Sequence, residues 1–154
     1  MTAANFIDFS ATCRARILAA ADTLGGIQQV LDRDEDPAIL AKHSSDLPTV
    51  CVIPIGAGKL TVNLSMGGDD ILEEFEQHIV AYYRFSRDNK TPYSDINVIR
   101  QYAKDMLALF TGQANMAFNN CVIYKATIEI KPYEEMDFVL DRFLLTLSVK
   151  TFEY

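Results

Sequence analysis

Two strand-like segments close this chain, and they constrain its fold more than any other feature. Residues 121–131 and 138–151 are rich in β-branched and aromatic side chains, which is typical of strands. Polar and apolar side chains alternate along both segments. Because successive strand side chains point to opposite faces of a sheet, each segment has one apolar and one more polar face. A polar stretch that opens with Pro132 separates the two, so the sequence predicts a long C-terminal β-hairpin.

The N-terminal half predicts one helix and several short strands. Helical spacing of apolar residues favours a helix from Ser10 to Leu24, capped by Asp8 or Ser10 and stopped by Gly25 and Gly26. A short strand is expected at 27–32 and an exposed connection at 32–46. Further along, the pattern predicts strands at 49–55 and 59–65 that pair as a hairpin. A flexible glycine-rich loop is expected at 66–70.

The middle of the chain predicts a long strand and a second helix. Residues 73–86 alternate as in a strand with one wet face, which would carry Glu74, Glu76, His78 and Tyr82. Residues 94–111 carry an apolar stripe at steps of three and four, typical of a helix packed on a sheet. The expected fold is a single α+β domain over residues 1–154, a mostly antiparallel sheet with two main helices packed on it.

Composition excludes several classes of protein. The 154 residues carry a net charge of −7, and the 14 basic residues form no cluster that would grip nucleic acid. No apolar run approaches the length of a membrane helix, and the N-terminus lacks the basic start of a signal peptide, so we expect synthesis in the cytoplasm. The cysteines Cys13, Cys51 and Cys121 form no CxxC pair, and buried reduced thiols are expected.

No motif in the chain predicts catalysis, a cofactor or a metal. The segment GAGK at 56–59 lacks the first glycine and the following Ser or Thr of a phosphate-binding loop, so a turn is the better interpretation. The acidic run at 32–36 lacks the glycine and the final glutamate of a calcium loop. His43 and His78 have no second histidine at metal-ligand spacing. A Cys-His pair brought together by the fold stays open, without positive support.

Some apolar and aromatic side chains are expected on faces that a monomer would leave wet. Tyr82 and Leu144 fall on the polar faces of their strands, and Phe152 and Tyr154 lie at the C-terminus. Aromatic residues in such places are enriched at subunit interfaces, so these four residues are the predicted interface. The alternative is that the N-terminal helix covers this face of the sheet.

The order of elements resembles a family. Four segments carry the resemblance: GGIQQV at 25–30, PTVCVIPI at 48–55, YYRF at 82–85 and DRFLLTLSVK at 141–150, with the amphipathic helix between the last two. Across residues 8–152, this arrangement is similar to the tail-terminator (tail-completion) proteins of long-tailed bacteriophages. The resemblance implies a virion protein that assembles into a ring, typically of six subunits. The ring would cap the tail tube, stop its polymerisation and present a surface to the neck proteins, with DNA passing through the lumen.

The resemblance implies no catalytic residues. It makes two exposed segments candidates for contact with tube or neck, an acidic one with Asp34, Glu35 and Asp36 and a glycine-rich one with Gly67, Gly68 and Asp69. The expected partners are other copies of the chain and the tube and neck proteins, with no sequence-specific binding of nucleic acid and no membrane. Two alternatives stay open: another neck or tube component, and a small ligand-binding or enzymatic α+β domain with a pocket beside the second helix.

Overall fold

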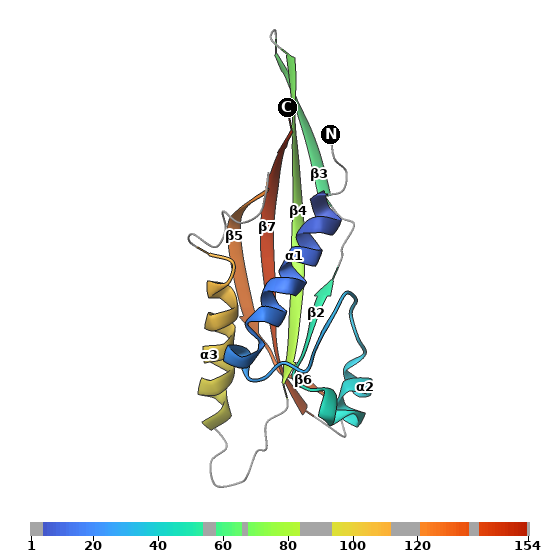
Figure 1. Cartoon of the computed structure of the whole chain (residues 1–154), viewed down its shortest axis with the longest axis vertical. Helices are drawn as coiled ribbons and strands as arrows, with labels where there is room; N and C mark the ends of the chain where they lie inside the picture. Colours follow the sequence, from blue (N-terminus) through green and yellow to red (C-terminus); the bar gives the residue numbers. More distant parts are fainter. Residues whose placement is uncertain are drawn as a thin grey trace.

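The computed structural model describes residues 5–53, 58–65, 68–83, 94–111, 121–135 and 139–153, and these form one mixed sheet with helices on it (Figure 1). The predicted α+β class is confirmed. In chain order the elements are α1 (Asn5–Ala19), the 3-10 turn η1 (Ala21–Leu24), β1 (Gln29–Leu31), α2 (Pro37–Lys42), the 3-10 turn η2 (Ser44–Asp46), β2 (Thr49–Ile53), β3 (Gly58–Ser65), β4 (Gly68–Tyr83), α3 (Ser94–Ala108), β5 (Cys121–Ile130), β6 (Tyr133–Glu134) and β7 (Val139–Glu153).

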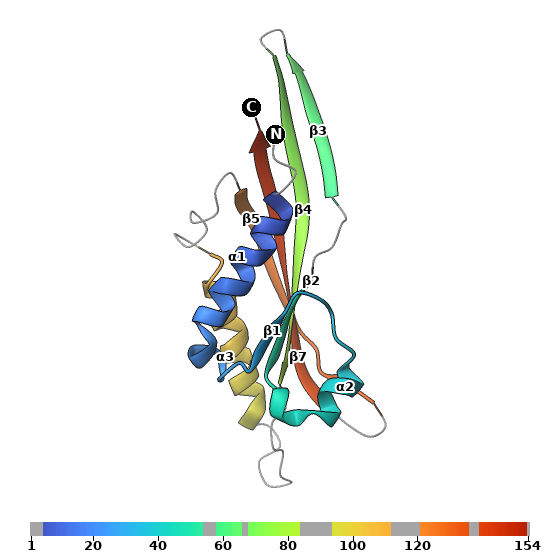
Figure 2. The same cartoon turned by 45° about the vertical axis from the view of Figure 1, so that its right-hand side comes forward.

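The central strands run in the order β1-β2-β4-β7-β5, and all neighbours are antiparallel except the parallel pair β1 and β2. The two 15-residue helices, α1 and α3, lie on one face of this sheet, and α2 lies on the other (Figure 2). The main core fills the space under α1 and α3. It includes Phe9, Ile17, Ile79, Phe110 and Phe143, all at most 2% exposed.

Helix α1 begins at Asn5 and ends at Ala19, whereas the sequence predicted Ser10 to Leu24. Ser10 is 1% exposed within the helix, and its hydroxyl donates to the Gln77 side chain instead of capping a helix end. The predicted glycine stop is correct for the turn that follows. Gly25 ends η1 with φ of 90°, and a Cβ there would lie 2.9 Å from the Tyr102 ring, so this position requires glycine.

Helix α3 confirms the predicted apolar stripe. Ile99, Met106 and Phe110 are buried and Tyr102 is half-buried, with its ring stacked on Tyr83 at 5.2 Å between centroids. The Tyr83 hydroxyl donates to the Leu24 carbonyl oxygen at 2.7 Å, so this stack also ties η1 to the sheet.

Strand β4 changes its partner partway along one edge. Its residues 78–82 pair with β2, and residues 68–75 pair with β3, while β7 runs along the other edge. The predicted hairpin between residues 49–55 and 59–65 is therefore wrong, because β3 pairs with the strand after it. The predicted flexible loop is also partly strand: Gly68 pairs with Ser65 and Asp69 with Leu64. Pairing to a neighbouring strand overrides the loop tendency of Gly and Asp.

A β-bulge in β5 reconciles its sequence with a single buried face. The register against β7 shifts between Ile123 and Lys125, which leaves Tyr124 as the extra residue. Cys121 and Ile123 before the bulge are buried, and Ala126 and Ile128 after it also pack against the core. Without the extra residue, strict alternation would turn one of these two groups toward solvent.

A second, smaller core lies on the opposite face, beneath α2. The sequence predicted an exposed connection at 32–46. Most of its described residues are exposed, but residues 37–42 form α2 and bury Leu40, so the prediction is wrong there. Asp36 caps α2 by accepting from the Ala38 amide at 2.9 Å, and Pro37 takes the first helical position, where its missing amide costs nothing. The cluster comprises Leu40, Leu47, Cys51, Val80, Tyr82 and Leu140.

Candidate assembly surfaces

The described residues contain no group of three or more His, Cys, Asp or Glu side chains placed to hold a metal ion, and no described helix is long and apolar enough to cross a membrane. All three cysteines are buried and free. Burial raises the pKa of Cys13 and Cys51 to about 12 and that of Cys121 to about 11. These thiols are therefore protonated and unreactive at neutral pH.

The most prominent surface feature is an arm that we define as β3 with residues 68–75 of β4. Both strands extend past the end of α1 (Figures 1 and 2). Gly58 of β3 pairs with the core residue Phe75, and Leu60 and Val62 lie two and four positions after Gly58. Because strand side chains alternate between the two faces, Leu60 and Val62 point to the same sheet face as Phe75. Yet Leu60 is 64% exposed and Val62 49% exposed, because the helices do not reach this part of the sheet. Two large apolar side chains thus stand on an uncovered face.

A buried polar contact fixes the point where the arm leaves the body. Gln77 is fully buried and lies on β4 between the part that pairs with β2 and the part that pairs with β3. Its amide nitrogen donates to the Ile53 carbonyl oxygen at 2.8 Å, and its amide oxygen accepts from the Ser10 hydroxyl. Gln77 therefore joins α1, the end of β2 and the base of the arm.

Replacing Gln77 with leucine is expected to lower the free energy of unfolding by about 1–3 kcal/mol, because the buried Ser10 hydroxyl and the part-buried Ile53 carbonyl oxygen would each lose this partner. Urea denaturation measures this. Gln101→Leu is the matched control, since Gln101 is exposed and, among the described residues, its side chain bonds only Asp105 on its own helix, and it should change stability by less than about 0.5 kcal/mol. Equal effects at the two positions would contradict this role of Gln77.

A hollow of about 300 Å³ lies at the base of the arm, on the sheet face away from α1 and α3. Its lining carries charges of both signs. Lys59 lies there with Glu74 and Glu76, and Glu74 also pairs with Lys150 at 3.8 Å. The Lys150 ammonium lies 4.4 Å from the centroid of the Tyr124 ring. Tyr124 is 50% exposed and its neighbour Val122 44% exposed, so β5 also presents apolar surface.

A second hollow, of about 290 Å³, lies near the acidic segment. Asp34 and Glu129 line it together with Lys131 and Arg142. Arg142 is held in place: its Nε donates to the Lys131 carbonyl oxygen at 3.1 Å, and its guanidinium lies 5.4 Å from the Tyr133 ring centroid. The opposite charges lie together around the hollow, which gives it no strong preference for a cation or an anion.

The structure separates the four predicted interface residues. Tyr82 is 3% exposed in the small core, so the premise that a monomer cannot bury it is wrong. Within the described residues α2 packs on this face, and the N-terminal helix packs on the opposite one. Burial also raises the pKa of Tyr82 to about 12. Leu144 is half-buried against the same cluster. The side chain of Phe152 and the whole of Tyr154 lie outside the described residues.

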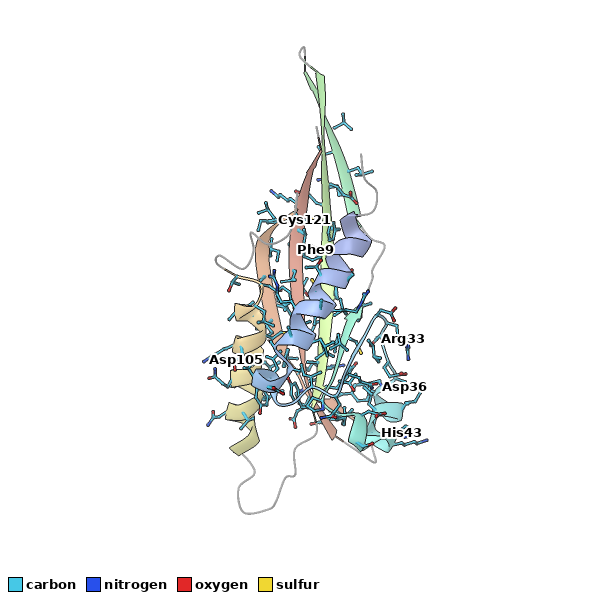
Figure 3. All side chains as sticks on the ribbon, in the orientation of Figure 1. Phe9, Arg33, Asp36, His43, Asp105 and Cys121 are labelled. Carbon is cyan, nitrogen blue, oxygen red and sulfur yellow. The ribbon has the colours of Figure 1, made fainter. Side chains whose placement is uncertain are left out.

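The two predicted contact segments lie far apart in the fold. Asp34, Glu35 and Asp36 lead into α2, and Figure 3 shows Arg33, Asp36 and His43 together on that side of the molecule. Part of this negative charge is neutralised locally, since Glu35 pairs with Arg33 at 3.6 Å. Gly68 and Asp69 belong to β4 in the arm, and Gly67 lies outside the described residues.

Sequence reasoning missed the exposed residues Leu60, Val62, Val122 and Tyr124. The alternation of residues 59–65 showed a strand with an apolar face, but only the structure shows that no helix reaches it. No protein-family model matches this chain, and no curated protein matches it either. The function must therefore be argued from the surfaces themselves.

Proposed function

We propose that this chain is a structural virion protein, a tail terminator that assembles as a ring, caps the tail tube and joins it to the neck. The observation that carries the proposal is the arm, which places Leu60 and Val62 on an uncovered sheet face at 64% and 49% exposure. Exposed apolar surface on a projecting element is typical of a protein that packs against another chain.

The build of the chain supports the same proposal. α1 and α3 lie on one face of the sheet, β7 pairs antiparallel with β4 and β5, and the order of elements resembles tail-terminator proteins. The net charge of −7 is compatible with DNA passing through a lumen without being held, because like charges repel. The proposed partners are other copies of the chain, the tube protein and the neck proteins.

Native mass spectrometry and light scattering test the proposal, across micromolar to millimolar concentration and in the presence of purified tail tubes. We expect a closed ring of about six copies, in solution or on the tube end. Tubes should also stop growing once the protein is added. A chain that stays monomeric at the highest concentration and on tubes would overturn the proposal.

A further inference from the structure

The described sheet has three edge strands, β1, β3 and β5, whose outer edges pair with no other described strand, and β1 is only three residues long. β3 pairs only with β4, and β5 pairs only with β7. Such an edge offers backbone amide and carbonyl groups to a strand from another chain. The eight residues of β3 are close in number to the ten of β5. We infer that β3 of one copy adds to the outer edge of β5 in the next copy, an inference that rests on the proposed ring.

The two edges cannot meet within one molecule. β4 and β7 lie between β3 and β5, which places the two strands about 14 Å apart at ordinary strand spacing. The contact must therefore join two copies, with a different surface contributed by each. A head-to-tail contact of this kind gives a ring when its rotation closes.

The faces of the two strands match. Ala126, Ile128 and Ile130 of β5 lie half-buried on the face that packs against the main core. Leu60 and Val62 lie on the corresponding face of β3. If β3 continues the sheet beside β5, its apolar side chains extend the covered face of the neighbour. A shift by one residue would place them in water, so the pattern also favours a single register.

The charges of the two surfaces are complementary. β3 itself carries one basic residue, Lys59, and the four acidic residues of the arm, at 69, 70, 73 and 74, lie on β4, one strand spacing of about 4.8 Å behind β3. Residues 121–131 contain two lysines, Lys125 and Lys131, against one acidic residue, Glu129. An acidic arm is therefore attracted to a basic edge in a chain that is acidic overall, and this attraction should weaken as salt rises.

A matched pair of leucines tests the inference. Leu60→Asp should weaken self-association about tenfold or more, measured by light scattering. Leu18→Asp is the control, because Leu18 is 58% exposed on α1 and belongs to neither edge strand, and its rings should form normally. Thermal unfolding followed by circular dichroism should be unchanged in both. If the native chain forms rings and Leu60→Asp forms them equally well, the inference is overturned and the proposed function stands.

Photo-crosslinking locates the contact. A benzophenone attached to Thr61→Cys reacts with whatever lies beside β3, and the three native cysteines are buried from the label. Mixing heavy-isotope and unlabelled copies identifies links between copies. We expect such links to fall in residues 121–131. Rings whose links fall elsewhere would overturn the inference alone, whereas a native chain that never forms rings would overturn the proposed function with it.

Discussion

Replacing Phe110 with alanine is expected to lower the free energy of unfolding by about 3–5 kcal/mol, the usual cost of removing a fully buried aromatic ring. Phe110 is 0% exposed and lies just beyond the end of α3. The Arg16 guanidinium lies 5.9 Å from its ring centroid and donates to the Leu109 carbonyl oxygen at 2.9 Å. The ring therefore packs where α1 and α3 meet above the sheet, and its removal leaves a cavity shared by both helices.

Lys104→Ala is the control for this prediction, since Lys104 is exposed on the same helix. Its effect should stay within about 0.5 kcal/mol. Urea denaturation of both variants, with equal slopes, gives the comparison. Similar losses at the two positions would mean that the buried face of α3 has been assigned incorrectly.

Much of the fold could be predicted because hydrophobic periodicity is a local signal. The stripe on α3 and the alternation along β4 and β7 each identify an element and its buried face. The short strand at β1 was also predicted. Element ends were less accurate: Ser10 has the chemistry of a helix cap, but the fold uses its hydroxyl against Gln77, 67 positions away.

Strand partners could not be predicted from local patterns. Residues 59–65 are separated by short glycine-containing segments from strands on both sides, so either hairpin agrees with the sequence. The structure pairs β3 with β4. One local signal was overlooked, since Asp36 followed by Pro37 is a cap and first-position pair that predicts α2. Helix α2 in turn decides which residues the second sheet face buries.

The exposed apolar residues were also predicted at the wrong positions, because burial, like strand pairing, depends on elements that are distant along the chain. Tyr82 lies on a strand face that seemed polar by sequence, and the burial of that face depends on α2 and Leu140, which are distant along the chain. Leu60 lies on a face that is covered elsewhere in the sheet but not in the arm. Burial is set by which elements cover a strand at each point, and this needs the tertiary arrangement.

Replacing Tyr82 with glutamate is expected to destabilise the folded monomer by about 3–5 kcal/mol, because the change removes a buried ring and introduces a charge in its place. Tyr82 is 3% exposed. Arg142 lies close enough to attract the new carboxylate, but Asp34 also faces this position and repels it. Tyr82→Phe keeps the ring, and it should cost no more than about 1.5 kcal/mol.

The cost of the glutamate should depend on pH. In a desolvated site its pKa in the folded state is raised above the unfolded value of about 4.3. The folded state then binds the proton more tightly than the unfolded state does. The Tyr82→Glu variant is therefore most stable below the unfolded pKa of about 4.3, and it loses stability as pH rises through the raised folded pKa. Urea denaturation of Tyr82→Glu and Tyr82→Gln at pH 4.5 and pH 7 should show a deficit that grows with pH in the glutamate variant only. A glutamate variant that is as stable as the native chain but fails to form rings would contradict the burial of Tyr82 within one subunit and place its side chain at a subunit interface.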